Sequence, residues 1–412
     1  MSGITAATYV VEDSRERERR EQRAAWADYA VQRAELTALR AEADGYRSVL
    51  GKAVAKVPSA GRLSRGASAA DIRRAGDETR RMVAEHRERL RTSVVAAARE
   101  KALRSAPAAT PAAGEVGEVL RRPAGRRVTA RSVVDTAAER VAAEKSRALR
   151  ETLAVRAAAL SARLPLQAAD DVRAACARAV EEITAAPSEA RARLLLTDLA
   201  TKVRKEEQRE EEVVRAGATL AGMAARLDAI ETAEAGALRA QIDAMIRQRS
   251  RTVPADLVAG VDAAVEQADR AVNRRMVAAA MRLSLDDLGY AVTEGFETVL
   301  ADRGVAYASL PKRPGYGVKV LLDAGQDVVR TQVVRSDEAH EGGRTADVAA
   351  ESSFCESYPL LLRRMQRNGV AAEAIATVPP GRNRLGTVAA IDLPAAEAYQ
   401  QRSGHQAKEM GR

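Results

Sequence analysis

The sequence predicts a mainly α-helical protein in which long helices, packed as a bundle or as coiled-coil-like hairpins, precede a small α+β domain. Composition is the first reason. Charged residues make up 30% of the 412 residues and aromatic residues 3%, and a chain dominated by Ala, Arg, Glu and Leu is typical of long helices. The second reason is an abrupt change at residue 289, after which more than half of the aromatic residues lie between Tyr290 and Tyr358. The large core residues should therefore gather in the C-terminal domain.

Residues 1–105 are expected to form a helical arm with two helices. The first helix is predicted over residues 11–58. It opens with an almost wholly charged stretch, in which Glu16 and Arg20 stand four residues apart, a spacing that supports a solvated helix. An apolar side follows, and Pro58 ends the helix.

The second helix of the arm is predicted over residues 68–104. Ser68 can cap its N-terminus, with Asp71 three positions later, close to a capping box. Its apolar residues recur mostly every three or four positions, and His86 on this stripe is expected at the edge of the core rather than in a metal site. Residues 106–126 are rich in Pro, Ala and Gly and predict a linker.

Residues 127–288 are expected to form a long-helix bundle or hairpin region. Apolar periodicity and the positions of the prolines predict helices at 128–163, 167–185, 188–249 and 254–288. In the longest of them a fully polar stretch at 205–212 precedes an apolar stripe, which the charged Glu234 interrupts and which resumes out of heptad register. Because strict heptads do not persist, the pattern favours bundle or antiparallel packing over a long parallel coiled coil.

Residues 289–394 are expected to form the α+β domain, an antiparallel meander with one face covered by a helix. Turns that contain Gly or Pro separate strand-like segments at 290–300, 304–310, 316–323 and 327–335. A helix at about 346–368 would cover the sheet with Phe354, Tyr358, Leu361, Leu362 and Met365, and Pro359 could kink it. An edge strand is expected at 372–378, and the tail at 395–412 is expected to be disordered.

The net charge of +9 raises the question of nucleic-acid binding. Residues 289–412 carry as many acidic as basic residues, so the whole excess lies in residues 1–288. Acidic residues are interleaved there, and the basic residues are nearly all arginine, which fits a GC-rich coding bias of bacterial type. The densest basic run, at 121–127, has few aromatic residues nearby to stack on bases. The sequence therefore predicts only a weak, salt-sensitive association with nucleic acid.

Cysteine usage and hydropathy indicate a protein of the reducing cytoplasm. The two cysteines, Cys176 and Cys355, are far apart and form neither a disulfide framework nor a zinc pattern. The N-terminus has no secretory pattern, and no run of about 18 apolar residues predicts a membrane span. Because the histidines are few and scattered and no phosphate-binding glycine motif is present, we expect neither a metal nor a cofactor.

The least implausible catalytic pair is Cys355 with Glu351, both on the predicted covering helix. A nucleophilic thiol needs a base or a cation that lowers its pKa, and the nearest histidine in the sequence, His340, lies in a polar loop. Burial of Cys355 between helix and sheet is the simpler interpretation, and Cys176 is expected to be a packing residue. The string DEAHE at 337–341 stands alone, without the other motifs of a helicase. No catalytic residue is therefore predicted.

The lack of catalytic motifs, together with apolar stripes on long charged helices, predicts a non-enzymatic scaffold or adaptor. The helices would self-associate or reach across a distance, and residues 289–394 would bind a protein partner. Two alternatives stay open. One is a helical protein that associates with nucleic acid without sequence specificity, and the other is a cysteine-dependent enzyme in the C-terminal domain.

Overall fold

The computed structural model describes residues 4–105, 130–323, 327–338 and 343–394. The chain forms two compact units, a sheet unit made of residues 1–21 and 262–412 and a helical unit made of residues 22–261. The mainly helical class, with a C-terminal antiparallel sheet, is confirmed. The expected linker at 106–126 and the expected tail at 395–412 lie outside the described residues.

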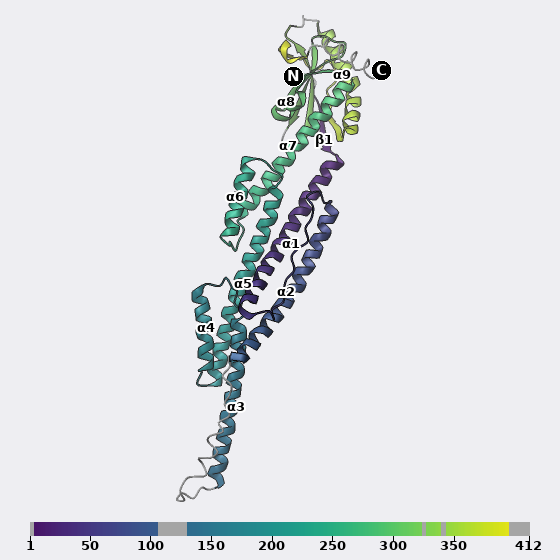
Figure 1. The fold of residues 1–412 in the computed structure, drawn as a ribbon. Helices are drawn as coiled ribbons and strands as arrows, with labels where there is room; N and C mark the ends of the chain where they lie inside the picture. The colour runs from purple at the N-terminus through teal and green to yellow at the C-terminus, as the bar shows by residue number, and fades with distance from the viewer. Residues whose placement is uncertain (1–3, 106–129, 324–326, 339–342, 395–412) are drawn as a thin grey trace, which may run out of the picture. The chain divides into compact units, whose positions relative to one another are not determined.

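The long helices follow the predicted order along the chain (Figure 1). Helices α1 to α7 span Ser14–Leu50, Ala69–Ser105, Ala130–Ser161, Asp170–Thr184, Glu189–Leu227, Ala233–Arg247 and Ala255–Asp287. The division between the two units falls inside α1 and inside α7. At the start of α2, the Ser68 hydroxyl accepts a hydrogen bond from the Asp71 backbone N at 3.2 Å, as the capping pattern predicts.

The single helix predicted at 188–249 is in fact two helices, α5 and α6. Thr232 caps α6 by accepting a hydrogen bond from the Ala235 backbone N at 3.1 Å. Ile230, in the turn between the helices, is 5% exposed, so burial of its side chain holds the turn in place. Glu234, where the apolar stripe is interrupted, lies in the first turn of α6. The interruption in the sequence therefore marks a helix end.

Separate apolar cores hold the helical unit together. One lies between α1 and α2, and a second between α3, α4 and α5 includes the fully buried Cys176. Helix α5 also packs closely on α1 at Gly222, where a Cβ atom would lie 2.7 Å from Cγ2 of Val31 and 3.3 Å from the carbonyl oxygen of Ala27. The helices thus pack against one another, as the apolar stripes predict.

The sheet unit is built on strands in the order β2–β3–β4–β5–β1–β6. Strands β1 to β6 span Ile4–Val11, Ala291–Val292, Val305–Ser309, Tyr316–Asp323, Val328–Ser336 and Val370–Ala376. Neighbours on this path are antiparallel, whereas β7 (Gly386–Val388) pairs in parallel with the end of β5. Strand β6 lies at one end of the path, so the edge strand expected at 372–378 is confirmed.

Strand β1 is the main difference from the sequence-based expectation, which places the whole of residues 1–105 in a helical arm. Ile4–Val11 instead form a strand between β5 and β6. Tyr9 is buried in the core and its neighbour Val10 is exposed, an alternation that a half-buried strand requires. The pair Thr5–Thr331 joins residues 326 positions apart, so local patterns do not reveal the pairing, although the Ile, Thr, Tyr and Val residues of this segment are typical of a strand.

The segment 290–300 is a second correction, because only two of its residues form a strand and its last five begin a helix. Only Ala291–Val292 form a strand, and α8 spans Phe296–Arg303. Gly295 and Gly304 flank α8 with φ angles of 85° and 72°, which glycine adopts without a steric penalty. Phe296 and Leu300, four positions apart, are both fully buried. Their spacing therefore serves a helix face rather than a strand.

One face of the sheet carries the core of this unit. Helix α8, the second half of α7 and α9 (Gly343–Arg367) cover it, and the predicted covering helix at 346–368 is confirmed as α9. The ring of Phe354 lies between those of Tyr290 and Tyr358, with centroids 6.4 and 5.7 Å away. On the opposite face, Leu393 lies against Gly317, and the Ser309 hydroxyl donates to the Pro394 carbonyl at 2.6 Å. The segment after β7 therefore covers part of that face.

Candidate functional site

The environment of Cys355 does not favour a nucleophile. The thiol lies on α9 and is partly buried. Burial raises its pKa, and the negative charges of Glu351 and Glu356 raise it further. A thiol surrounded in this way stays protonated at neutral pH, whereas nucleophilic cysteines need the opposite shift. His340, the nearest histidine in the sequence, lies outside the described residues.

Glu351, the proposed partner of Cys355, has a structural contact instead. Its side chain is buried, and Oε2 accepts a hydrogen bond from the Gly381 backbone N at 2.5 Å. Arg344 donates to the Gly381 carbonyl at 3.0 Å, so both residues fasten the loop after β6 to α9. Gly381 has a φ of 76°, and a Cβ there would lie 2.8 Å from Val348. The other carboxylate oxygen of Glu351 has no hydrogen-bond partner in the described part of the chain.

The remaining residues singled out in the sequence lie in packed positions. Cys176 is fully buried among α3, α4 and α5, and burial raises its pKa. The Nδ1 atom of His86 on α2 is buried and has no hydrogen-bond partner among the described residues. Within those residues no group of three His, Cys, Asp or Glu side chains could hold a metal ion.

The polar stretch at 205–212 is the centre of an ion-pair network that sequence analysis did not identify. It lies in the middle of α5. Arg163, just after α3, donates two hydrogen bonds of 3.0 Å to the Glu207 carboxylate. Arg91 on α2 donates to Glu211 at 3.0 Å, and Arg249, just after α6, contacts Glu210 at 2.5 Å. This stretch therefore ties α5 to other segments of the helical unit through charge pairs. The run of glutamates was the available signal, but their partners are distant in sequence.

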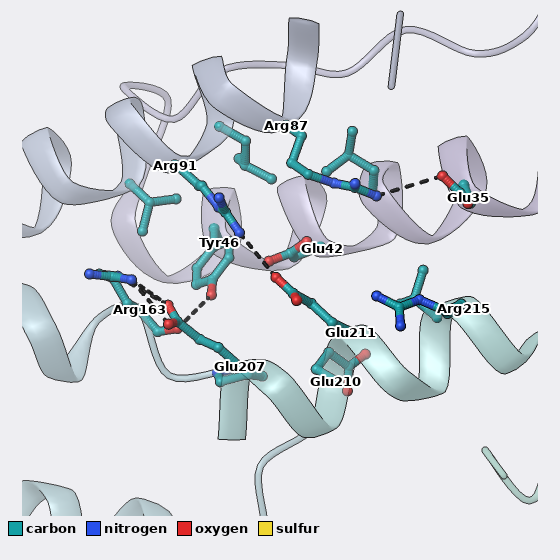
Figure 2. A pocket seen from close by; sticks show the side chains of 15 residues that line it. Glu35, Glu42, Tyr46, Arg87, Arg91, Arg163, Glu207, Glu210, Glu211 and Arg215 are labelled. Atoms are coloured by element: carbon teal, nitrogen blue, oxygen red, sulfur yellow. Dashed lines mark hydrogen bonds and ion pairs between the residues drawn. The ribbon is translucent and has the colours of Figure 1, made fainter. Parts of the chain in front are cut away.

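A pocket of about 320 Å³ lies beside this network, entirely within the helical unit (Figure 2). Helices α1, α2 and α5 and the residues after α3 line it. Its apolar wall is formed by Leu39, Leu90, Val94, Pro165 and Val214, and its polar wall by Glu35, Glu42, Tyr46, Arg87, Arg91, Arg163, Glu207, Glu210, Glu211 and Arg215. Its volume is at the lower end of the range for small-molecule pockets.

Two ionisable groups of the pocket have pKa values above the ordinary range. Burial raises the pKa of Glu42, and the charge of the nearby Glu210 raises it further. The residue as a whole is exposed, so the desolvation that raises this pKa acts on the carboxylate from the helices around it and is only partial. Burial also raises the pKa of Tyr46, whose hydroxyl donates to the Arg163 carbonyl at 3.1 Å. The pocket therefore disfavours additional negative charge around α1.

A second candidate site is the free edge of the sheet. Within the described residues β6 pairs only with β1, and its residues from Glu373 to Ala376 are exposed. Val10 on β1 is 63% exposed and Ile375 on β6 is 57% exposed. The register pairs Val10 with Ala371, and it shifts by one residue at Ile375, which has no partner on β1. This edge thus combines unpaired backbone groups with exposed apolar side chains.

Comparison with known proteins gives no relative: no family model, no curated protein and no solved structure matches the chain. Across the described residues, none of the helices has the length and apolar character needed to cross a bilayer.

Proposed function

We propose that this protein is a non-enzymatic scaffold or adaptor of the cytoplasm, and that its sheet unit binds a protein partner at the outer edge of β6. The observation that carries the proposal is the free edge itself. An extended peptide can add to such an edge, with backbone hydrogen bonds providing affinity and alternate side chains providing specificity. Ile375, which is exposed on the edge strand, would contact a side chain of the added segment, and the exposed Val10 lies one strand further from the edge.

The helical unit serves as the support in this proposal. Its helices are joined by apolar cores and by the ion pairs of α5. Apolar side chains exposed on its surface, such as Leu103 on α2 and Leu194 on α5, are candidate contacts for self-association. A cysteine-dependent enzyme has less support, because the charges around Cys355 oppose thiolate formation.

The test uses three purified forms of the full chain: wild type, Ile375→Lys and Ile391→Lys. Ile391 is a matched control, because it is 92% exposed and lies after β7, away from the β6 edge. A partner captured from native lysate at equal stoichiometry by wild type and Ile391→Lys, but lost with Ile375→Lys, would support the proposal. Hydrogen exchange of the purified complex should then slow in residues 370–376.

Two results would count against edge binding. The first is a stoichiometric partner that Ile375→Lys retains while the exchange of β6 stays unchanged. The second is the absence of any stoichiometric partner for the full chain, together with a monomer at all concentrations. The second result would remove the adaptor interpretation altogether.

A further inference from the structure

Most of the charged side chains in the pocket of the helical unit have a partner of opposite charge. Arg163 pairs with Glu207, Arg91 with Glu211 and Arg87 with Glu35, the last at 3.7 Å. Glu210 pairs with Arg249, which lies outside the pocket. These contacts satisfy the polar wall and hold α2, α5 and the residues after α3 together.

Two side chains of the pocket are left over, Glu42 on α1 and Arg215 on α5. In the part of the chain that the structure describes, neither side chain has a hydrogen bond or an ion pair. Figure 2 shows both pointing into the space between the helices. Both residues are exposed, so a ligand can reach them. The pocket thus offers one carboxylate and one guanidinium that have no ion pair among the described residues, although the charges of Arg87 and Arg91 are close enough to Glu42 to lower its pKa in part.

Part of the pocket wall is apolar. Leu39, Leu90 and Val94 belong to the core that α1 and α2 share, and each has part of its side chain at the pocket surface. A short methylene chain can lie on such a wall, where its removal from water favours binding. Charged groups at its two ends would complete the ion pairs that the protein leaves open.

We propose that the pocket binds a small zwitterionic molecule, with its ammonium group on Glu42, its carboxylate on Arg215 and its methylene chain on the apolar wall. The zwitterionic class of the ligand follows from the two side chains without an ion pair, because a purely cationic or purely anionic ligand would pair with only one of them. The raised pKa of Glu42 agrees with this class, since a ligand cation would replace the proton that this carboxyl tends to keep. The site is independent of the partner edge on β6.

The pH dependence of binding has a definite sign. The ammonium group pairs with the ionised form of Glu42, whose pKa is raised by burial and by the charge of Glu210. The groups that face Glu42 from the packed helices are Glu207 and Glu210 on α5 and Arg87 and Arg91 on α2. Affinity should therefore increase as pH rises through the raised pKa of Glu42 and should then level off.

Isothermal titration calorimetry of the full chain against unbranched ω-amino acids tests the proposal. The probes are β-alanine, γ-aminobutyrate, δ-aminovalerate and ε-aminocaproate, with butylamine and butyrate as compounds that carry only one of the two charges. We expect millimolar or tighter binding for at least one zwitterion and weaker binding of both single-charge compounds. Glu42→Gln and Arg215→Gln should each weaken binding by about fivefold, since a pair of this exposure contributes up to about 1 kcal/mol.

Matched controls separate the site from general effects of charge. Glu88→Gln on α2 and Arg204→Gln on α5 remove charges of the same kind from exposed positions outside the pocket and should leave affinity unchanged. Arg215→Lys keeps the positive charge and should retain measurable binding. This result would show that the loss of binding in Arg215→Gln comes from the lost charge and not from misfolding. The proposal is overturned if no zwitterion binds at millimolar concentration, if butylamine or butyrate binds as tightly, or if either Gln variant at the pocket retains full affinity.

Discussion

Replacing Gly222 with alanine should destabilise the helical unit, whereas the same replacement at Gly217 should stabilise it. Both glycines lie inside α5. Glycine in a helix interior is less favourable than alanine by about 0.8–1.0 kcal/mol, so both variants gain this intrinsic term. The neighbours of the added Cβ decide the difference. At Gly217 no atom lies within 4 Å of it.

At Gly222 the added Cβ would lie 2.7 Å from Cγ2 of Val31 and 3.3 Å from the carbonyl oxygen of Ala27. Valine has a stiff χ1 angle in a helix, and a backbone oxygen cannot move alone, so α1 and α5 must separate slightly. Extra atoms in a packed interface typically cost about 1–3 kcal/mol. The net effect of Gly222→Ala is therefore between about zero and 2 kcal/mol of destabilisation, and the two variants should differ by about 1–3 kcal/mol.

Thermal unfolding followed by far-ultraviolet circular dichroism measures this difference. For a unit of this size, 1 kcal/mol shifts Tm by about 2–4 °C, so Gly217→Ala should unfold above wild type and Gly222→Ala below Gly217→Ala by several degrees. The comparison of two alanines in one helix cancels effects on the unfolded chain. Equal stabilisation by both variants would refute the close packing of α5 on α1 at Gly222.

Four further predictions concern charge. Burial and Glu210 raise the pKa of Glu42, so the folded state resists its ionisation and stability falls as pH rises from the ordinary glutamate range through the raised pKa. Glu42→Gln should therefore be more stable than wild type above that window and equal below it in chemical denaturation. Arg163→Ala should lower the free energy of unfolding by about 1 kcal/mol or less. In a double-mutant cycle its coupling to Glu207→Ala should be about 0.2–1 kcal/mol, and zero coupling would contradict the ion pair between Arg163 and Glu207. Because its pKa is raised, Cys355 should react with iodoacetamide more slowly than a free cysteine at neutral pH, and Cys355→Ala should capture the same partner as wild type. Fluorescence anisotropy should detect only weak DNA binding that vanishes as salt increases, and absence of binding at low salt would remove the nucleic-acid alternative.

The sequence by itself determines much of the helical architecture. Prolines, capping residues and apolar periodicity are local properties, and they place α1, α2, α4, α7 and α9 within a few residues of their observed bounds, apart from the late end predicted for α1. The change of composition at residue 289 likewise marks where the strands β2 to β6 begin. The interruption of the apolar stripe at Glu234 was visible too, but a stripe alone does not distinguish a helix end from a change of packing face.

Tertiary structure alone decided the rest, because it depends on contacts between distant residues. Strand β1 depends on its pairing with β5 and β6; its Ile, Thr, Tyr and Val residues are typical of a strand, but they do not show which strands it joins. The second half of the segment 290–300 begins a helix because Phe296 and Leu300 bury their side chains on one face between two left-handed glycines. The partners of the α5 glutamates come from α2, from the residues after α3 and from those after α6. Only folding reveals which charges of the pocket have no ion pair among the described residues, and these are Glu42 and Arg215.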